Sequence, residues 1–190
     1  SEAHGAHFGF HPYFPENANQ QGADVVIHSV HKTLPAPTQT ALFHMNGNLA
    51  DREAVRKYLH MFQSSSPSYI LMAGIDACMG LLETKADDLF SKYADRLQRT
   101  RKKLGKLKNL ELEESEHFDR SKIVISTKNT MLTGKQLYEE LLEHYHLQME
   151  MAAGAYIIAM TSIGDTDAGM ERLEDALFEI DMNWEVQKTT

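Results

Sequence analysis

Hydrophobic positions in the first 84 residues fall into short runs interrupted by glycine, proline and serine. The β-branched run at residues 24–27 predicts a buried strand, and residues 39–44 predict the strand that follows it. Asp51 is a favourable N-cap for a helix that extends to about residue 63. A second helix is predicted from Ser66 or Ser68, because apolar residues recur at helical spacing at Ile70, Leu71, Ile75 and Met79.

Beyond residue 84, the segments with regularly spaced apolar residues are longer. Residues 84–108 are charged with one apolar stripe, which predicts a connecting helix that ends near Gly105. Thr133 is a favourable N-cap for the helix that follows it. The remaining pattern predicts strands at 110–114, 122–127, 147–151 and 156–161, and helices at 133–145 and 166–184. This alternation predicts a small open sheet with helices on one face, so we expect three parts: 1–84, 85–108 and 109–190.

Composition narrows the classes of partner and compartment. The chain carries 19 basic and 27 acidic residues and a formal net charge of −8, so we expect no nucleic-acid or anionic-membrane partner. Cys78 is the single cysteine, which excludes an internal disulfide and fits a reducing compartment. The sequence has no apolar run of the ~20 residues that a membrane span needs, and it opens without a signal-peptide pattern. We therefore expect a cytoplasmic protein.

Lys32 is the first candidate for chemistry. It follows the first predicted strand, between the hydroxyls of Ser29 and Thr33 and directly after His31. One interpretation is a solvated lysine at a strand end, since lysine is rarely buried. The other is an amine held for Schiff-base chemistry, whose pKa would be lowered by desolvation and neighbouring cations. The adjacent hydroxyls suit the phosphate of a bound cofactor.

Six of the ten histidines lie in the first 44 residues. The spacing of His4, His7 and His11 would place three ligands on one helix face. Two glycines and a proline oppose a helix there, and no carboxylate or cysteine completes a metal set, so no metal site is predicted. Histidines with local hydrogen bonds, or a histidine that contacts a cofactor, fit better. Before the last helix, residues 164–166 predict a helix cap rather than a phosphate site, because Asp165 would repel an anion.

Three segments together resemble the Orn/Lys/Arg decarboxylase family: EAHGAHF at 2–8, HSVHKTLP at 28–35 and SSSPSY at 64–69. The stretch AMTSIGDT at 159–166 supports the same resemblance. Members of this family are pyridoxal-phosphate enzymes of the aspartate-aminotransferase fold type. The resemblance implies an α/β fold, namely part of the large domain of a fold-type I transferase, followed by a small α+β C-terminal domain. It also implies a homodimer or a higher homo-oligomer.

The resemblance further implies roles for individual residues. Lys32 matches the lysine that forms the internal aldimine with pyridoxal 5'-phosphate. His4 matches a histidine near the cofactor ring, which makes it a second catalytic candidate, and Ala3 would pack against the pyridine. Three other residues match positions that contact the cofactor: Ser29, His31 and Ser66. Of these, Ser66 would contact the phosphate of the cofactor bound in the partner subunit.

The implied reaction is decarboxylation of lysine, ornithine or arginine, and the choice among them stays open. Ser1 stands where the family has aspartate, and Pro37 stands where leucine is expected. In the family about half of the large domain precedes the EAHG element, so we expect this chain to be a C-terminal portion. The alternative is a catalytically inactive dimerising fragment that associates through exposed strand edges. A pyruvoyl group formed at Ser1 is a third interpretation, which the setting of Lys32 disfavours.

Overall fold

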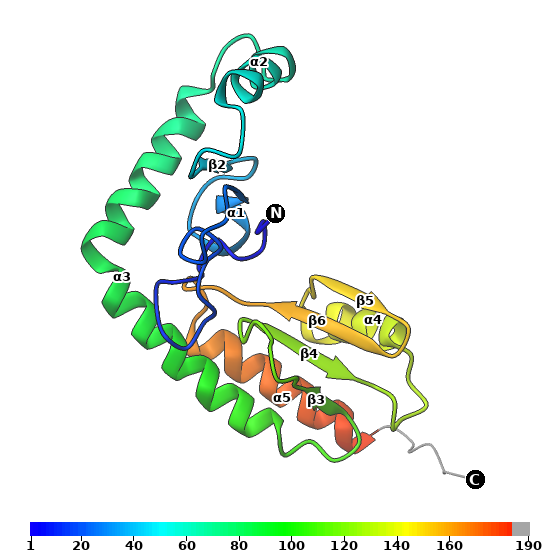
Figure 1. The fold of residues 1–190 in the computed structure, drawn as a ribbon. Helices are drawn as coiled ribbons and strands as arrows, with labels where there is room; N and C mark the ends of the chain where they lie inside the picture. Colours follow the sequence, from blue (N-terminus) through cyan, green and yellow to red (C-terminus); the bar gives the residue numbers. More distant parts are fainter. Residues whose placement is uncertain (184–190) are drawn as a thin grey trace. The chain divides into compact units, whose positions relative to one another are not determined.

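A computed structural model of the protein describes residues 1–183, which form two compact units. The first unit comprises residues 1–90 and the second begins at residue 91. Helix α3 (Tyr69–Leu104) contains the boundary between them, as its green ribbon in Figure 1 shows. The predicted division at residue 84 stays a prediction. None of the helices in residues 1–183 combines the length and the apolar character that a membrane span requires.

The first unit is built around an antiparallel pair of strands. Strand β1 (Val25–His28) pairs with β2 (Leu42–Met45), and the single-turn helix α1 (Val30–Thr33) follows β1. Both strands were predicted, but the prediction that β1 is a buried strand is wrong for half of its residues. Its residues alternate between exposed and buried, and Val25 and Ile27 are the exposed ones. The reason is that this two-stranded sheet is covered on one face only.

Helix α2 (Arg52–Phe62) begins at the predicted N-cap. The Asp51 carboxylate accepts hydrogen bonds from the backbone amides of Glu53 (3.0 Å) and Ala54 (3.1 Å), which satisfies two of the helix's unpaired donors. None of the residues of α2 is buried. Its apolar side therefore remains exposed in the described chain, at Tyr58, Leu59, Met61 and Phe62.

Helix α3 is one continuous helix of 36 residues, whereas the sequence predicts two helices that meet near Thr84. The prediction is wrong at that junction because the threonine does not interrupt the backbone ladder. Its hydroxyl donates to the carbonyl of Gly80 at 2.9 Å, four residues earlier. A threonine bonded in this way is accommodated inside a helix. Both units therefore share this helix as a structural element.

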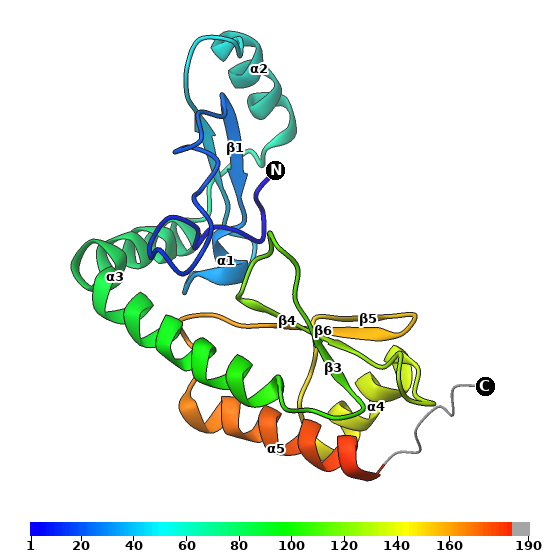
Figure 2. The ribbon, with the colours of Figure 1, turned by 60° about the horizontal axis from the view of Figure 1, so that its bottom comes forward.

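The second unit is a four-stranded antiparallel sheet with helices. Its strand order is β3-β4-β6-β5, and Figure 2 shows α4 and α5 on the same side of the sheet. The predicted open sheet with helices on one face is therefore confirmed. Its elements are β3 (Glu111–Glu113), β4 (Lys122–Ser126), α4 (Gly134–Tyr145), β5 (Met151–Ala153), β6 (Tyr156–Met160) and α5 (Asp167–Asn183). The predicted last residue of α5, Trp184, lies outside the described residues.

Two caps of the second unit were predicted correctly. The Thr133 hydroxyl accepts from the Gln136 amide at 3.2 Å, and the Gln136 side chain accepts from the Thr133 amide at 2.8 Å, which makes a capping box. At the start of α5, the hydroxyl of Thr166 accepts from the Gly169 amide at 3.1 Å. Residues 164–166 therefore cap a helix, as the sequence indicated.

The strand predicted at residues 147–151 is wrong for its first four residues. Helix α4 ends at Tyr145, and its C-cap residue His146 adopts a left-handed conformation with φ of 54°. The amide of Leu147 then donates back to the carbonyl of Leu141 at 2.9 Å. The chain thus turns back after α4, the Glu150 amide donates to the Ile158 carbonyl at 2.9 Å, and β5 begins only at Met151.

Tyr93 is one of the largest side chains in the core of the second unit, and its hydroxyl lies in a buried hydrogen-bond chain. The phenol oxygen is 2.7 Å from the Thr161 hydroxyl, which donates to the Ser121 carbonyl at 2.7 Å. Burial raises the pKa of Tyr93 far above its ordinary value, although the interaction with the Thr161 side chain opposes the shift.

This burial predicts a loss of stability at alkaline pH. Above about pH 10 an unfolded tyrosine loses its proton while folded Tyr93 keeps it, so the unfolded state binds fewer protons and the free energy of unfolding decreases. We expect urea midpoints measured between about pH 9 and 11 to fall more steeply for the wild type than for Tyr93→Phe. The control is Tyr58→Phe, at an exposed tyrosine, which should keep the wild-type slope. Equal slopes for wild type and Tyr93→Phe would contradict the prediction.

Candidate functional site

Ala3 and His4 occupy the two central positions of a tight turn. The amide of Gly5 donates to the carbonyl of Glu2 at 3.0 Å and closes the turn. Glycine fits closely at residue 5, because a Cβ there would lie 2.7 Å from the Glu2 Cγ and from the ring of Phe8, so that one of these side chains would have to move. The Glu2 amide in turn donates to the carbonyl of Ile27 at 3.0 Å. This bond places the turn beside the last residues of strand β1.

Lys32 lies in α1, immediately after that strand. Its side chain is half-buried, and its Nζ is 3.2 Å from the Nε2 of His4. Because an ammonium group only donates, the His4 Nε2 accepts and the proton of the neutral ring is on Nδ1. The structure thus brings together the two predicted catalytic residues, which are 28 positions apart in the sequence.

The other predicted contacts lie at different places in the first unit. Ser29 is the N-cap of α1, yet its side chain makes no capping hydrogen bond. The Nδ1 of His31 is 2.9 Å from the carbonyl of Thr40, to which it donates, so Nδ1 carries a proton. Ser66 is exposed in the loop between α2 and α3, and the described contacts do not join it to Lys32.

Thr33, directly after Lys32, is buried at 2% exposure. Within residues 1–183 its hydroxyl has no hydrogen-bond partner. A buried hydroxyl without a partner is uncommon and calls for an explanation. Together with the uncapped Ser29, it leaves two hydroxyls beside Lys32 with unused bonding capacity.

A set of three titratable side chains next to this site was not predicted. The Nε2 of His28 is 2.6 Å from the Glu2 carboxylate, and its Nδ1 is 3.1 Å from the Nε2 of His44. Burial lowers the pKa of His44, and repulsion between the two rings when both are protonated lowers it further, whereas the Glu2 carboxylate opposes the shift. The available signal was that His28 directly follows the first predicted strand and His44 ends the second, so that their side chains could share one face.

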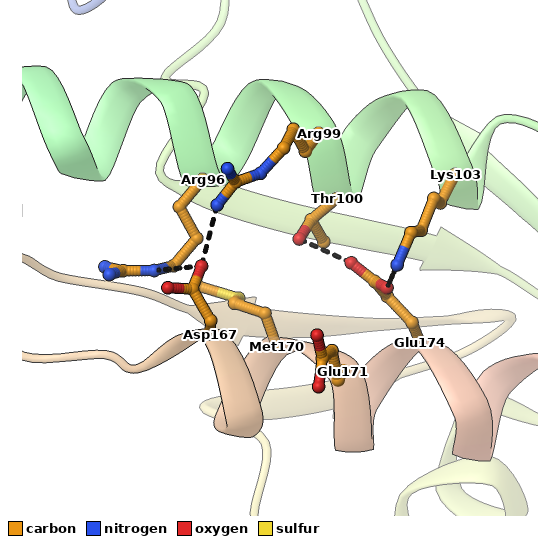
Figure 3. Close-up of a pocket in the computed structure, with 8 residues that line it drawn as sticks. All are labelled: Arg96, Arg99, Thr100, Lys103, Asp167, Met170, Glu171 and Glu174. Atoms are coloured by element: carbon orange, nitrogen blue, oxygen red, sulfur yellow. Dashed lines mark hydrogen bonds and ion pairs between the residues drawn. The ribbon is translucent and has the colours of Figure 1, made fainter.

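The second unit contains a charged cavity of about 350 Å³ between α3 and α5. Figure 3 shows that its charges face one another across the two helices. Asp167 pairs with Arg96 at 3.1 Å and Arg99 at 2.7 Å, and Lys103 pairs with Glu174 at 2.6 Å. Accordingly, Arg96 lowers the pKa of Asp167. These groups neutralise one another and join α3 to α5. The cavity is therefore a poorer candidate for a functional site than the Lys32 region.

No group of three or more metal-ligating side chains was found in the described part of the chain. The predicted interpretation of the N-terminal histidines as local hydrogen-bonding groups fits His11, whose Nδ1 accepts from the Tyr13 amide at 3.1 Å. His7 is buried and lies edge-on to the rings of Phe8 and Phe14.

Comparison with known proteins identifies the family. Residues 1–173 match the major domain of the Orn/Lys/Arg decarboxylases. This chain belongs to that family. Arginine decarboxylase from Bacillus subtilis is 30% identical over 197 residues, a match that covers 100% of this chain and 40% of the relative. Arginine decarboxylase from Halalkalibacterium halodurans is 32% identical, over 94% of this chain and 38% of the relative. The chain therefore spans about two fifths of the length of these curated relatives.

Solved structures confirm the predicted fold class. The lysine decarboxylase LdcF of Francisella novicida superposes with a TM-score of 0.72 at 18% identity, over 83% of this chain and 28% of that one. An alanine–glyoxylate aminotransferase from Nostoc gives a TM-score of 0.62 at 15% identity, over 87% and 50% of the two chains. The chain thus has the mixed α/β fold shared by these decarboxylases and aminotransferases. A separate small C-terminal domain stays a prediction.

Proposed function

We propose that this chain supplies the lysine-bearing part of the active site of a pyridoxal-phosphate-dependent decarboxylase that acts on a basic amino acid. The observation that carries the proposal is the 3.2 Å contact between the Lys32 amine and the His4 imidazole. Family membership and the arginine decarboxylases among the relatives support it. Because the chain spans about 40% of those relatives, we assign the complete reaction to a longer protein that contains these residues.

The residues around Lys32 suit pyridoxal 5'-phosphate. A half-buried amine that can bond to an aldehyde is followed by a buried hydroxyl without a partner in the described chain, at Thr33. Lys32 would hold the cofactor covalently, and Ser29 is a donor for its phosphate. Ala3 and His4 would lie against the ring, with His31 nearby and Ser66 offered to the partner subunit. When bound, the cofactor supplies an electron sink for the electron pair left by the departing carboxylate.

The side chains of this chain would manage protons. Lys32 is a nucleophile only after its ammonium group loses a proton, and the Nε2 of His4 lies within hydrogen-bonding distance to accept it. His4 is exposed, so the proton can pass on to solvent. The reverse transfer, from Lys32 or His4, would protonate the substrate's α-carbon. The hydrogen bond from His31 to the Thr40 carbonyl holds the imidazole of His31, next to Lys32 in the sequence, in one orientation.

The test is covalent trapping. The protein is mixed with pyridoxal phosphate, reduced with borohydride and digested, and the adducts are located by peptide mass. We expect one dominant adduct at Lys32, with little at exposed lysines such as Lys57 and Lys85. Adducts spread over the surface lysines, or no adduct, would contradict the proposal.

A second candidate function rests on exposed apolar side chains. Within the first unit, α2 and the start of α3 expose residues that a soluble chain usually covers, among them Phe62 (85% exposed), Ile70 (81%) and Tyr69 (79%). The chain by itself would then be a catalytically inactive dimerising fragment of a cytoplasmic homo-oligomer. Sedimentation over a range of concentrations tests this function, and a monomer throughout would contradict it.

A further inference from the structure

Glu2, His28 and His44 form an unbroken hydrogen-bonded chain beside the Lys32 site. The carboxylate of Glu2 accepts from His28 at 2.6 Å, and His28 meets His44 at 3.1 Å. The side chains of His28 and Glu2 are only 9% and 14% exposed. Hydrogen bonds that involve a charged group in such a setting are short and strong.

The strand register explains why the two histidines meet. His44 on β2 lies directly opposite Val26 on β1, and His28 is two residues beyond Val26. The two histidines are therefore diagonal neighbours on one face of the sheet, with ring centroids 4.8 Å apart. Their contact is a property of the β1–β2 pairing and does not depend on the loops.

Glu2 links this hydrogen-bonded chain to the turn that contains His4. Its carboxylate also accepts from the Ala18 amide, at 3.0 and 3.2 Å from its two oxygens. Its backbone carbonyl closes the turn by accepting from the Gly5 amide. Glu2 thus fixes the first position of the turn. His4, at a central position of the same turn, contacts Lys32. On the other side His28 is separated from the α1 helix only by Ser29.

We propose that Glu2, His28 and His44 are positioning residues that hold the His4 imidazole against the Lys32 amine. His44 donates from Nε2 to the Nδ1 of His28, and His28 donates from Nε2 to Glu2. This arrangement fixes one tautomer of His28 and one orientation of the carboxylate. The inference rests on the proposed function only where it treats the His4–Lys32 contact as catalytic. The positioning of His4 itself does not require the cofactor.

The first experiment is Glu2→Gln, read by NMR without cofactor. In the wild type we expect His28 as the Nε2–H tautomer in ¹⁵N-histidine spectra, and a nuclear Overhauser effect between the His4 ring and the Lys32 side chain. In Glu2→Gln both signals should change or disappear. The matched control is Glu16→Gln, the same substitution at an exposed site, which should leave both signals unchanged. An unchanged His4–Lys32 signal in folded Glu2→Gln would overturn the inference.

A second pair of variants keeps the test decisive if Glu2→Gln does not fold. His44→Leu removes the donor to His28, whereas His44→Gln retains one. We expect the leucine variant to alter the His28 tautomer and the His4–Lys32 signal, and the glutamine variant to restore both. His60→Leu, at an exposed histidine of α2, is the control. If the leucine and glutamine variants both match the wild type, the inference is overturned.

The trapping reaction separates this inference from the proposed function. If both hold, Glu2→Gln should form about tenfold less adduct at Lys32 than the wild type, while the exposed lysines react unchanged. A wild type without any Lys32 adduct, but with the NMR changes described, would refute the proposed function and leave the positioning intact. Normal trapping in all variants, with unchanged NMR signals, would refute the positioning alone.

Discussion

Lys32→Ala is expected to reduce decarboxylation by about 10³-fold or more in a decarboxylase that contains these residues. The substitution removes both the group proposed to hold the cofactor and one of the two acids proposed to protonate the substrate's α-carbon. Carbon dioxide release from arginine, lysine and ornithine is the measurement, with kcat and KM determined separately. The loss should lie in kcat, because the amine acts on the reacting atoms rather than on the side chain of the substrate.

The matched control for this prediction is Lys57→Ala, which removes an exposed lysine of α2 and should leave turnover unchanged. His4→Ala should have a smaller effect, of about 10²-fold, since solvent can replace part of its role as proton acceptor. Activity of Lys32→Ala within tenfold of the wild type would contradict the assignment.

Asp181→Ala is expected to lower the free energy of unfolding by about 3 kcal/mol. This aspartate on α5 is 3% exposed, and its carboxylate accepts from three successive backbone amides. The distances are 2.8 Å to Lys108, 2.8 Å to Asn109 and 2.7 Å to Leu110. Alanine would leave these amides without their acceptor where α3 gives way to strand β3, and burial makes such a loss costly.

Urea unfolding followed by circular dichroism measures this effect. Asp181→Asn should fall between wild type and alanine, because its single carbonyl oxygen can still accept part of the set. Asp175→Ala, an exposed position on the same helix, is the control for the change in charge. A difference below about 1 kcal/mol between Asp181→Ala and this control would show that the loop is held by other contacts.

Local features of this protein were determined by its sequence. Asp51 and Thr133 cap their helices as predicted, because a cap depends on residues within three positions of it. The alternation of apolar residues predicted three strands of the second unit to within a few residues. The motif around Lys32 predicted the family, which the comparison confirms.

The tertiary structure decided which distant residues meet. Nothing near Glu2 in the sequence indicates His28, 26 residues later, and nothing near Asp181 indicates the amide of Leu110, 71 residues earlier. Burial of β1 was mispredicted for the same reason, since a β-branched run does not reveal how many of its faces are covered. Propensities and caps act over one turn of chain, whereas hydrogen bonds such as that between Glu2 and His28 depend on the path of the whole backbone.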